Sequence, residues 1–241
     1  HASYRRQRQM CIRDRGGEGD WKSDALNLVA RMPRLLGLIF RYREGRLVNI
    51  PADDLSMGLV ARFTNTLDLA DVDKSVMDQV IATYLVLHMD HGGGNLSTFA
   101  GKAVASGHAT VYSSMAGAMN ALSGPLHGRA NQSCFEFVQK IGTSDPAEVE
   151  AFVRGELEAR RPVFGFGHAV LRAEDPRATV QFALGEKICP DDEYFKTIRV
   201  LREVAPRVLA ENPKISNPNA NVDIASGTLL NYVGLCDPEY Y

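Results

Sequence analysis

The chain has 241 residues, of which 45% are hydrophobic and 23% are charged, and its formal net charge is -2. This composition is ordinary for a globular protein, and the length suffices for one large domain or two modest ones. The near-neutral charge argues against a broad nucleic-acid surface, which needs an excess of Lys and Arg. No apolar run approaches the ~20 residues that a membrane span requires.

Four cysteines are spread along the chain and form no CxxC pair: Cys11, Cys134, Cys189 and Cys236. This spacing is typical of neither a zinc site nor a dense disulfide scaffold. We therefore expect reduced, mostly structural thiols in a reducing compartment.

The first predicted elements are an irregular arm and a long helix. Residues 1–19 are rich in Arg and lack helical periodicity, which indicates a disordered arm or a non-native extension. Apolar residues then recur at helix spacing over 21–43, where Pro33 is expected to kink or divide the helix. Gly45 is expected to end it.

Helical patterns continue to the end of the chain. Asp53 or Asp54 is expected to cap a helix that carries Leu59 and Phe63. The later helices are expected at 72–90, 96–106, 110–122, 130–141, 145–160, 176–188 and 191–211, with a last amphipathic stretch from about Ser226. Alternating strand patterns are scarce, so the predicted fold class is all-α.

Two histidines stand beside the glycine run of LHMDHGGGN. His88 and His91 share one helix face at spacing i, i+3, with Asp90 next to them. His and carboxylate ligands allow a metal site, although the segment has no HExxH pattern and no obvious third ligand. The other interpretations are a helix-end donor to an anionic ligand and a structural His that is favourable to the helix dipole.

Two further histidines lie in glycine-containing loops. His127 in GPLHGRAN follows a Gly-Pro turn, and the start of the next helix is expected to favour its neutral imidazole as a donor. His168 in VFGFGHAVLRAEDPR stands in a loop expected to expose backbone N–H groups, and its GFG lacks the order of a dinucleotide fingerprint. Arg172 and Arg177 follow, and they indicate either an anion site or solvated surface arginines.

One acid stands out near the C-terminal end of the sequence. Asp223 in NPNANVDIASG comes directly after a run of turn-forming residues. An acid in such a place is ordinarily a helix cap, and the alternative is a catalytic carboxylate.

Four of these segments together resemble a known family. LHMDHGGGN, GPLHGRANQ, GFGHAVLRAEDPRA and NVDIASG resemble, in this order, the motif set of citrate synthase, in the variant of mitochondria and some bacteria. The likeness runs from about Trp21 to Tyr241 and implies an almost entirely helical homodimer with two domains that close over the active site. By the resemblance, 20–127 and 226–241 belong to the large domain and 128–225 to the small domain.

The resemblance also implies a reaction of the tricarboxylic acid cycle. An acyltransferase of this kind condenses acetyl-CoA with oxaloacetate and water to give citrate and CoA. It needs no resident cofactor or metal, since acetyl-CoA is a substrate, and no nucleic acid or membrane partner is implied. His127 would bind the thioester carbonyl, Asp223 would remove a methyl proton, and His168 would polarise the oxaloacetate ketone.

Other positions receive binding roles from the same resemblance. His91 and Arg177 would bind oxaloacetate together with His168, and Asn95 and Asn221 would support the site. The expected CoA-binding residues are Arg172 and the loop of Val163, Phe164, Gly165, Phe166 and Gly167.

The likeness ends at Tyr241, where the family continues into a helical region with a further substrate-binding arginine. Another arginine comes from across the dimer interface, and basic residues for CoA come from the N-terminal part of the large domain. We therefore expect a chain truncated at both ends, with negligible condensation activity by itself. A bacterial cytoplasm is the favoured location, and a mitochondrial matrix is the alternative.

Three other functions fit parts of the pattern. A 2-methylcitrate synthase that uses propionyl-CoA shares these motifs, because one methylene is discriminated by only ~1–3 kcal/mol through pocket shape. A non-catalytic helical module that binds CoA or a dicarboxylate would need the loops but not Asp223. A metal protein would use His88, Asp90 and His91.

Overall fold

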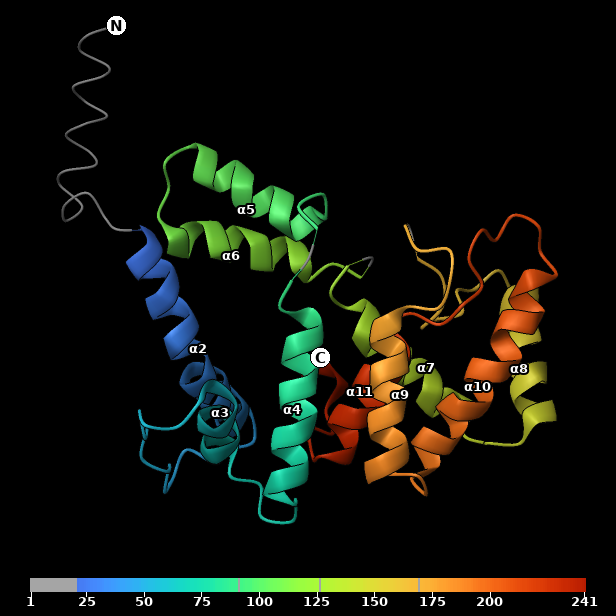
Figure 1. Cartoon of the computed structure of the whole chain (residues 1–241), viewed down its shortest axis with the longest axis horizontal. Helices are drawn as coiled ribbons and strands as arrows, with labels where there is room; N and C mark the ends of the chain where they lie inside the picture. Colours follow the sequence, from blue (N-terminus) through green and yellow to red (C-terminus); the bar gives the residue numbers. More distant parts are fainter. Residues whose placement is uncertain (1–20, 91, 126, 169) are drawn as a thin grey trace, which may run out of the picture. The chain divides into compact units, whose positions relative to one another are not determined.

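The computed structural model describes residues 21–90, 92–125, 127–168 and 170–241 (Figure 1). In these ranges the regular secondary structure is helical, with one isolated antiparallel bridge between Phe166 and Ala220. The prediction of an all-α fold is therefore confirmed. The arm predicted over 1–19 lies outside the described residues. None of the helices in the described ranges combines the length and the apolar character that crossing a membrane would require.

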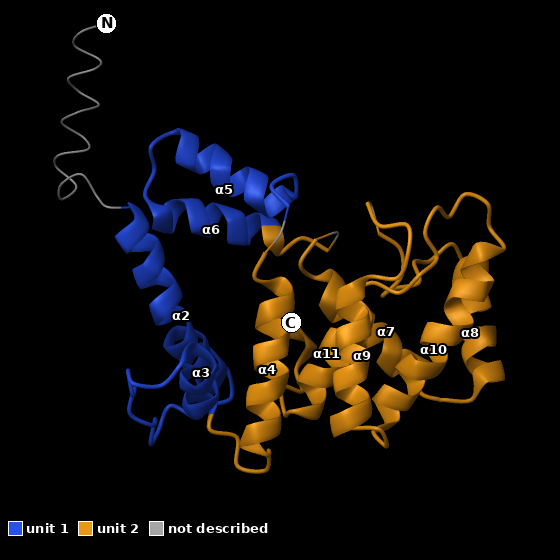
Figure 2. Ribbon diagram, viewed as in Figure 1, with its two compact units in different colours: residues 1–67, 92–121 blue, residues 68–91, 122–241 orange. Residues whose placement is uncertain are grey.

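The chain divides into two compact units (Figure 2). Unit 1 comprises His1–Leu67 and Gly92–Ala121, and unit 2 comprises Asp68–His91 and Leu122–Tyr241. Unit 1 holds the helices α2 (Trp21–Arg43), α3 (Leu59–Leu67), α5 (Leu96–Ser106) and all but the last residue of α6 (Val111–Leu122).

Helices α2 and α3 pack closely in unit 1. Gly37 allows the approach, because a Cβ at this position would lie 2.6 Å from Cγ2 of Thr66. The buried Arg41 donates from Nη1 to the carbonyl oxygen of Leu67 at 3.2 Å, and Arg62 donates from Nη1 to that of Ala30 at 2.8 Å. These arginines join the two helices with charge-assisted hydrogen bonds to backbone carbonyl oxygens.

Two expectations for unit 1 need correction. Helix α2 runs through the buried Pro33, so of the two expected effects of this proline, a kink or a division, the division is wrong. Helix α3 begins only at Leu59, because the acids before it have other partners. Asp53 pairs with Arg62, and Oδ1 of Asp54 accepts the backbone N–H of Ser56.

Unit 2 is a cluster of helices around a common apolar core. Its members are α4 (Lys74–His88), α7 (Ala130–Ile141), α8 (Pro146–Glu158), α9 (Pro176–Ile188), α10 (Glu193–Ala210), α11 (Asp223–Tyr232) and the 3-10 helix η1 (Pro238–Tyr240). Fully buried side chains from several of them meet in the core, including Phe135, Val149, Phe195, Leu201 and Ile224. Burial of such side chains stabilises each by about 1.5–3 kcal/mol.

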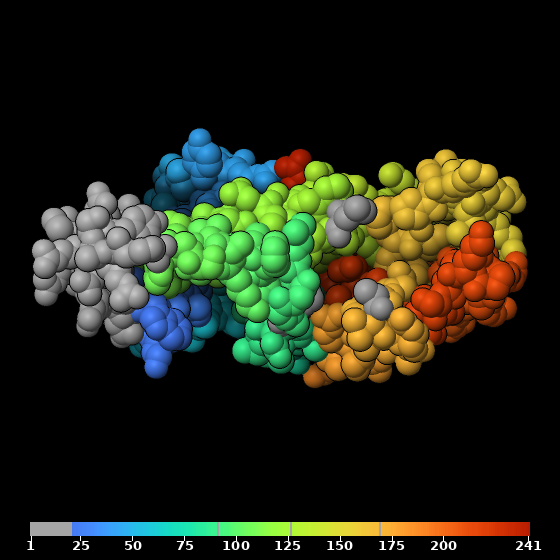
Figure 3. All heavy atoms as spheres, turned by 90° about the horizontal axis from the view of Figure 1, so that it is seen from above, coloured from blue at the N-terminus to red at the C-terminus, as the bar shows by residue number. Residues whose placement is uncertain are grey.

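Helix α11 is the central element of unit 2. It packs against α4, α7, α9 and α10. At one end of the unit, α8 packs against α10, and their atoms adjoin at the right of Figure 3 in yellow and orange-red. Arg154 of α8 forms an ion pair with Glu211 after α10, with 2.7 Å between Nη2 and Oε1. The first residue of α11, Asp223, is thus carried by the best-packed helix of the unit.

Candidate active site

Two segments far apart in the sequence are joined by backbone hydrogen bonds. Gly167 donates to the carbonyl oxygen of Asn219, and Asn221 donates to that of Gly165, each at 2.9 Å. The side chain of Asn221 adds a third bond, from Nδ2 to the carbonyl oxygen of Gly167 at 3.0 Å. The loop that carries His168 and the segment that leads to Asp223 are therefore one braced structure, which we call the paired segments (residues 165–177 and 217–223).

Asn217 braces the paired segments a second time. Its buried side chain donates from Nδ2 to the carbonyl oxygens of Leu171 and Ala173, at 3.0 and 3.3 Å. Its Oδ1 accepts the backbone N–H of Asn219 at 3.0 Å. Because both ends of the amide are used, the chain on either side of this residue is held in register with the loop after His168.

The ring of His168 is oriented by the residues that follow it. Nδ1 accepts the backbone N–H groups of Val170 and Leu171, at 3.0 and 2.9 Å. A neutral imidazole whose Nδ1 is an acceptor carries its proton on Nε2. His168 therefore offers an N–H donor at Nε2.

Asp223 is the first residue of α11, and Val222 before it provides no side-chain cap. Its backbone N–H donates to Oδ1 of Asn221 at 3.0 Å, which starts the helix three residues earlier than the predicted Ser226. Burial raises the pKa of Asp223 to about 6, the charge of Arg177 opposes this rise, and the charge of Asp175 adds to it. A carboxylate in such an environment is a stronger base than an ordinary Asp.

Arg177 lies in the first turn of α9 and is held by Asp175, the N-cap of that helix. Nη2 of Arg177 is 2.6 Å from Oδ2 of Asp175, and Nε is 3.0 Å from Oδ1. Nη1 of Arg177 has no hydrogen-bond partner among the described residues, so it is available to an anion. Arg172 instead directs Nη1 to the carbonyl oxygen of Leu171 at 2.8 Å and is exposed.

His127 lies in a tight turn before α7. Its backbone N–H donates to the carbonyl oxygen of Gly124 at 3.0 Å, and its carbonyl oxygen accepts from Ala130 at 3.1 Å. Helix α7 begins at Ala130, as expected, and His127 lies three residues before it. Helix α7 packs against α11, which Asp223 begins.

A buried amide lies in the first turn of α7. Both polar atoms of Asn131 are buried and lack a hydrogen-bond partner among the described residues. Burial raises the pKa of Tyr84 on α4, while the amide of Asn131 lowers it and the charge of Asp223 raises it. The amide of Asn131 thus lies near the Tyr84 hydroxyl but does not complete a hydrogen bond with it.

The glycine loop packs tightly on both neighbouring helices. Gly165 has φ of +82°, and a Cβ there would lie 2.9 Å from Sγ of Cys134 and 3.0 Å from Cβ of Ile224. Only glycine combines this conformation with this approach. The N–H of Gly167 is used within the paired segments, so the expectation that the loop exposes its backbone donors is wrong for this residue.

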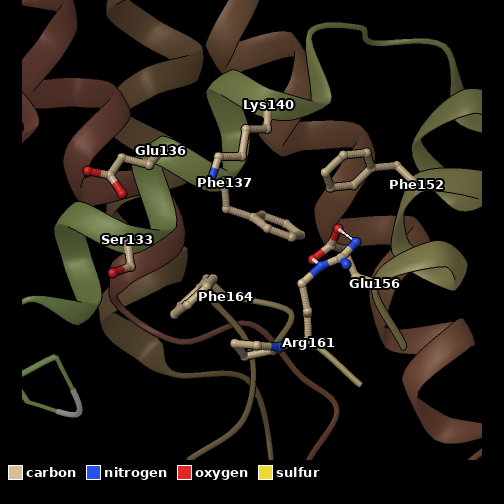
Figure 4. Close-up of a pocket in the computed structure, with 9 residues that line it drawn as sticks. Ser133, Glu136, Phe137, Lys140, Phe152, Glu156, Arg161 and Phe164 are labelled. Atoms are coloured by element: carbon tan, nitrogen blue, oxygen red, sulfur yellow. Dashed lines mark hydrogen bonds and ion pairs between the residues drawn. The ribbon is translucent and has the colours of Figure 1, made fainter. Parts of the chain in front are cut away.

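A hollow of about 590 Å³ lies beside the start of this loop (Figure 4). Phe137 of α7, Phe152 of α8 and Phe164 of the loop give it an aromatic lining, and the Phe137 and Phe152 rings meet edge to face. Arg161 and Glu156 pair across its rim at 2.7 Å. Phe164 connects this hollow with the loop expected to bind CoA, but none of His127, His168 and Asp223 lines it.

Three other candidate residues are Asn95, His91 and His88. Asn95 belongs to unit 1, where Oδ1 caps α5 by accepting the backbone N–H of Thr98 at 2.8 Å. His91 lies outside the described residues. His88 stacks on Tyr84, and its Nδ1 is 2.7 Å from the carbonyl oxygen of the same residue. Among the described residues no three His, Cys, Asp or Glu side chains are grouped as a metal would require.

Sequence reasoning passed over Asp175 and Asn217, which do most to hold the site residues in place. The sequence contains one signal for Asp175, the Asp-Pro pair that also starts α8 at Asp145. Nothing in that pair distinguishes an exposed cap from a buried one that also binds an arginine.

Comparison with known proteins identifies the family. The family model described as "Citrate synthase, C-terminal domain" matches residues 3–240. The chain belongs to the citrate synthase family. It is 40% identical to citrate synthase 5, mitochondrial, of Arabidopsis thaliana and 38% identical to the mitochondrial 2-methylcitrate synthase of Yarrowia lipolytica. Each likeness covers 90% of this chain but 47% and 48% of those proteins, so the chain spans about half the length of these curated relatives.

A solved structure from the same family has the same fold. The citrate synthase of the thermophilic archaeon Thermoplasma acidophilum superposes with a TM-score of 0.78 at 23% identity. The match covers 96% of this chain and 61% of the archaeal one. That structure is a ternary complex with carboxymethyl coenzyme A and oxaloacetate.

Proposed function

We propose that the whole protein to which these residues belong is a citrate synthase, which condenses acetyl-CoA with oxaloacetate and water to give citrate and CoA. The observation that carries this proposal is the joining of the His168 loop to the segment before Asp223. These hydrogen bonds bring a base of raised pKa and an oriented N–H donor onto one braced structure.

The first step of this reaction needs a base and a donor together. The methyl proton of a thioester is far less acidic than a carboxylic acid, whose pKa is about 4. Asp223 would remove this proton, and the buried surroundings that raise its pKa make it the stronger base. His127 would donate to the thioester oxygen as charge develops there, in the manner of an oxyanion hole.

The second step needs a donor at the other substrate. The enol carbon attacks the ketone of oxaloacetate, and the ketone oxygen becomes an alkoxide. His168 would supply the proton from Nε2, since its Nδ1 already accepts two backbone N–H groups. Arg177 would bind a carboxylate of oxaloacetate through its unused Nη1.

Other residues would complete the two substrate sites. His91 would also bind oxaloacetate, and Asn95 and Asn221 would support the site. For Asn221 the proposed support is the bond from its Oδ1 to the N–H of Asp223. The proposed CoA-binding residues are Arg172 and the loop 163–167, and the support for this role is their resemblance to the family motif.

The same proposal extends to assembly and location. The family resemblance favours a homodimer, a large domain that includes 20–127 and 226–241, and a small domain over 128–225. Acetyl-CoA and oxaloacetate are the proposed partners, with no resident cofactor. Relatives from Arabidopsis thaliana and Saccharomyces cerevisiae are described as mitochondrial. A bacterial cytoplasm is the location we favour for this protein, and a mitochondrial matrix is the alternative.

Release of free CoA by the whole protein tests the reaction. We expect thiol release only when acetyl-CoA and oxaloacetate are both present, and Asp223→Asn should reduce kcat by at least about 100-fold. Asp191→Asn, an exposed acid before α10, is the matched control and should keep full turnover. Full turnover of Asp223→Asn would remove the base assignment.

A 2-methylcitrate synthase is the second candidate, because a relative at 38% identity carries that name. It would use the same residues on propionyl-CoA, so the two enzymes differ in acyl preference only. Comparing kcat/KM for acetyl-CoA and propionyl-CoA decides between them, with a preference of about 10-fold or more expected for one methylene.

A further inference from the structure

We propose that Asp175 is a positioning residue of the site described above, which holds the Arg177 guanidinium in place and fixes the segment that leads into Asp223. The inference rests on the proposed function, because it concerns the same site. It assigns a role to a residue that stands within one of the family motifs, but to which the resemblance gives no function.

The carboxylate of Asp175 engages Arg177 with both oxygens. Oδ2 lies 2.6 Å from Nη2 and 3.1 Å from Nε, while Oδ1 lies 3.0 Å from Nε. Oδ1 also accepts the backbone N–H of Arg177 at 3.0 Å, so side chain and main chain are fixed by one group. Asp175 is only 1% exposed, so Arg177 cannot swing away without leaving a buried carboxylate without its partner.

The main chain of Asp175 holds the other half of the site. Its N–H donates to the carbonyl oxygen of Ala220 at 3.0 Å, three residues before Asp223. Ala220 also faces Phe166 in the isolated bridge, two residues before His168. Asp175 thus connects the start of α9 to the second of the paired segments, at a residue that also faces the His168 loop.

The charge of Asp175 acts on Asp223 as well. Arg177 and Asp175 from the start of α9 act on the pKa of Asp223, and the charge of Asp223 in turn raises the pKa values of Tyr84 from α4 and Cys134 from α7. Burial is the main cause that raises the pKa values of Tyr84 and Cys134, so both are neutral at ordinary pH. Burial by itself would raise the pKa of Asp175, but its bonds to Arg177 outweigh this and keep it ionised.

Two substitutions at this pair have opposite expected effects. Asp175→Asn keeps a polar cap but removes the negative charge that adds to the pKa of Asp223. Arg177→Gln removes the positive charge that lowers the pKa of Asp223, so this substitution should raise that pKa. A loss of local structure alone would admit water in both variants and lower the pKa of Asp223 in both.

Asp145→Asn is a matched control for the cap. Asp145 also precedes a proline at a helix start, and its Oδ1 accepts the backbone N–H groups of Ala147 and Glu148 at 2.9 and 3.0 Å. It is exposed and pairs with no arginine in the described part of the chain. Its substitution removes one charge and preserves an amide cap, as Asp175→Asn does.

The first measurement is the titration of the Asp223 carboxyl carbon by NMR in the 241-residue chain. We expect its pKa to fall by about one unit in Asp175→Asn, to rise in Arg177→Gln and to stay unchanged in Asp145→Asn. An unchanged pKa in Asp175→Asn overturns the proposal. Should that variant fail to fold, Arg177→Gln decides: a rise supports the charge relationship, and a fall overturns it.

The second measurement is steady-state kinetics of the whole protein. Asp175→Asn should raise KM for oxaloacetate about 10-fold and change kcat less, since Arg177 would be misplaced for binding. Asp145→Asn should change neither value. An unchanged KM in Asp175→Asn overturns the positioning of Arg177. Absence of condensation by the unmodified protein would refute the proposed function, and the carboxyl titration would still decide the role of Asp175.

Discussion

The ring of Phe195 occupies the space beside Gly185, where a Cβ would lie 2.0 Å from Cε2 of Phe195. Helices α9 and α10 approach each other at this point because residue 185 has no side chain. We expect Gly185→Ala to destabilise the chain by about 1–3 kcal/mol, since the buried ring must move out of its rotamer. Urea denaturation followed by circular dichroism measures the change.

Gly155 provides the control for that substitution. It lies within α8, and a Cβ there would meet no atom within 4 Å. Gly155→Ala should therefore stabilise the chain by about 0.5–1 kcal/mol, because alanine loses less backbone entropy on folding. Equal effects of the two substitutions would contradict the close approach at Gly185.

Asp223 is expected to weaken the fold at neutral pH. Its folded pKa of about 6 lies above the ordinary value of about 3.9, so the native state holds the proton more tightly than the unfolded state. The stabilisation that comes from the protonated Asp223 carboxyl is fully present below about pH 4. It is lost as the pH rises through the folded pKa of about 6. Asp223→Asn should thus be more stable than the natural chain at pH 7, by up to about 3 kcal/mol.

Thermal melts at pH 4, 6 and 7.5 check the sign of this effect. The advantage of Asp223→Asn should grow with pH over this range and be small at pH 4. Asp191→Asn, on an exposed residue, should show no such dependence. A destabilised Asp223→Asn at pH 7.5 would be the contrary result.

Asn217 offers a test of the brace between the paired segments. Asn217→Asp keeps the acceptor for Asn219 but removes both Nδ2 bonds, to Leu171 and Ala173. The carbonyl oxygens of Leu171 and Ala173 would then lose this donor, and a charge would stand at a buried position, which costs about 1–3 kcal/mol. Denaturation of the 241-residue chain measures this loss.

Asn212 is the matched position for that experiment. Its Oδ1 accepts the backbone N–H of Lys214 at 3.0 Å in an exposed turn. Asn212→Asp keeps this acceptor and should leave stability within about 0.5 kcal/mol. If both asparagines tolerate the change equally, Asn217 does not brace the site.

The cysteines should differ sharply in reactivity. Cys134 and Cys189 are buried, and burial raises the pKa of Cys189 to about 12 and that of Cys134 well above its usual value. Cys236 is exposed. Iodoacetamide followed by peptide mass spectrometry should modify Cys236 in the native chain and the two buried thiols only after denaturation. Rapid native labelling of Cys134 would show that the loop at Gly165 opens.

Much of the helix order could be predicted from the sequence. The bounds expected for 96–106, 130–141 and 176–188 agree with α5, α7 and α9, because residues such as Asn95, Gly142 and Asp175 cap them locally. The start of α11 could not be predicted in this way. Its first N–H is satisfied by the side chain of Asn221, whose own amide is committed to a loop 54 residues away in sequence.

The site was predictable in part for a similar reason. The order of the family motifs indicated His168, Arg177 and Asp223 as candidates, and in unit 2 all three lie on the paired segments. The importance of Asp175 depends on burial and on a backbone bond to Ala220. Both properties arise only when distant parts of the chain fold together, and no local pattern reports them.

The bonds between residues 165–167 and 219–221 set a limit on any loop transplant into this chain. A designer who grafts the His168 loop from a relative also removes the frame on which Asp223 is aligned. The reverse graft, of residues 217–223, would leave Leu171 and Gly167 without the amides of Asn217 and Asn221. The two paired segments therefore form one structural unit, and a graft has to exchange both of them together.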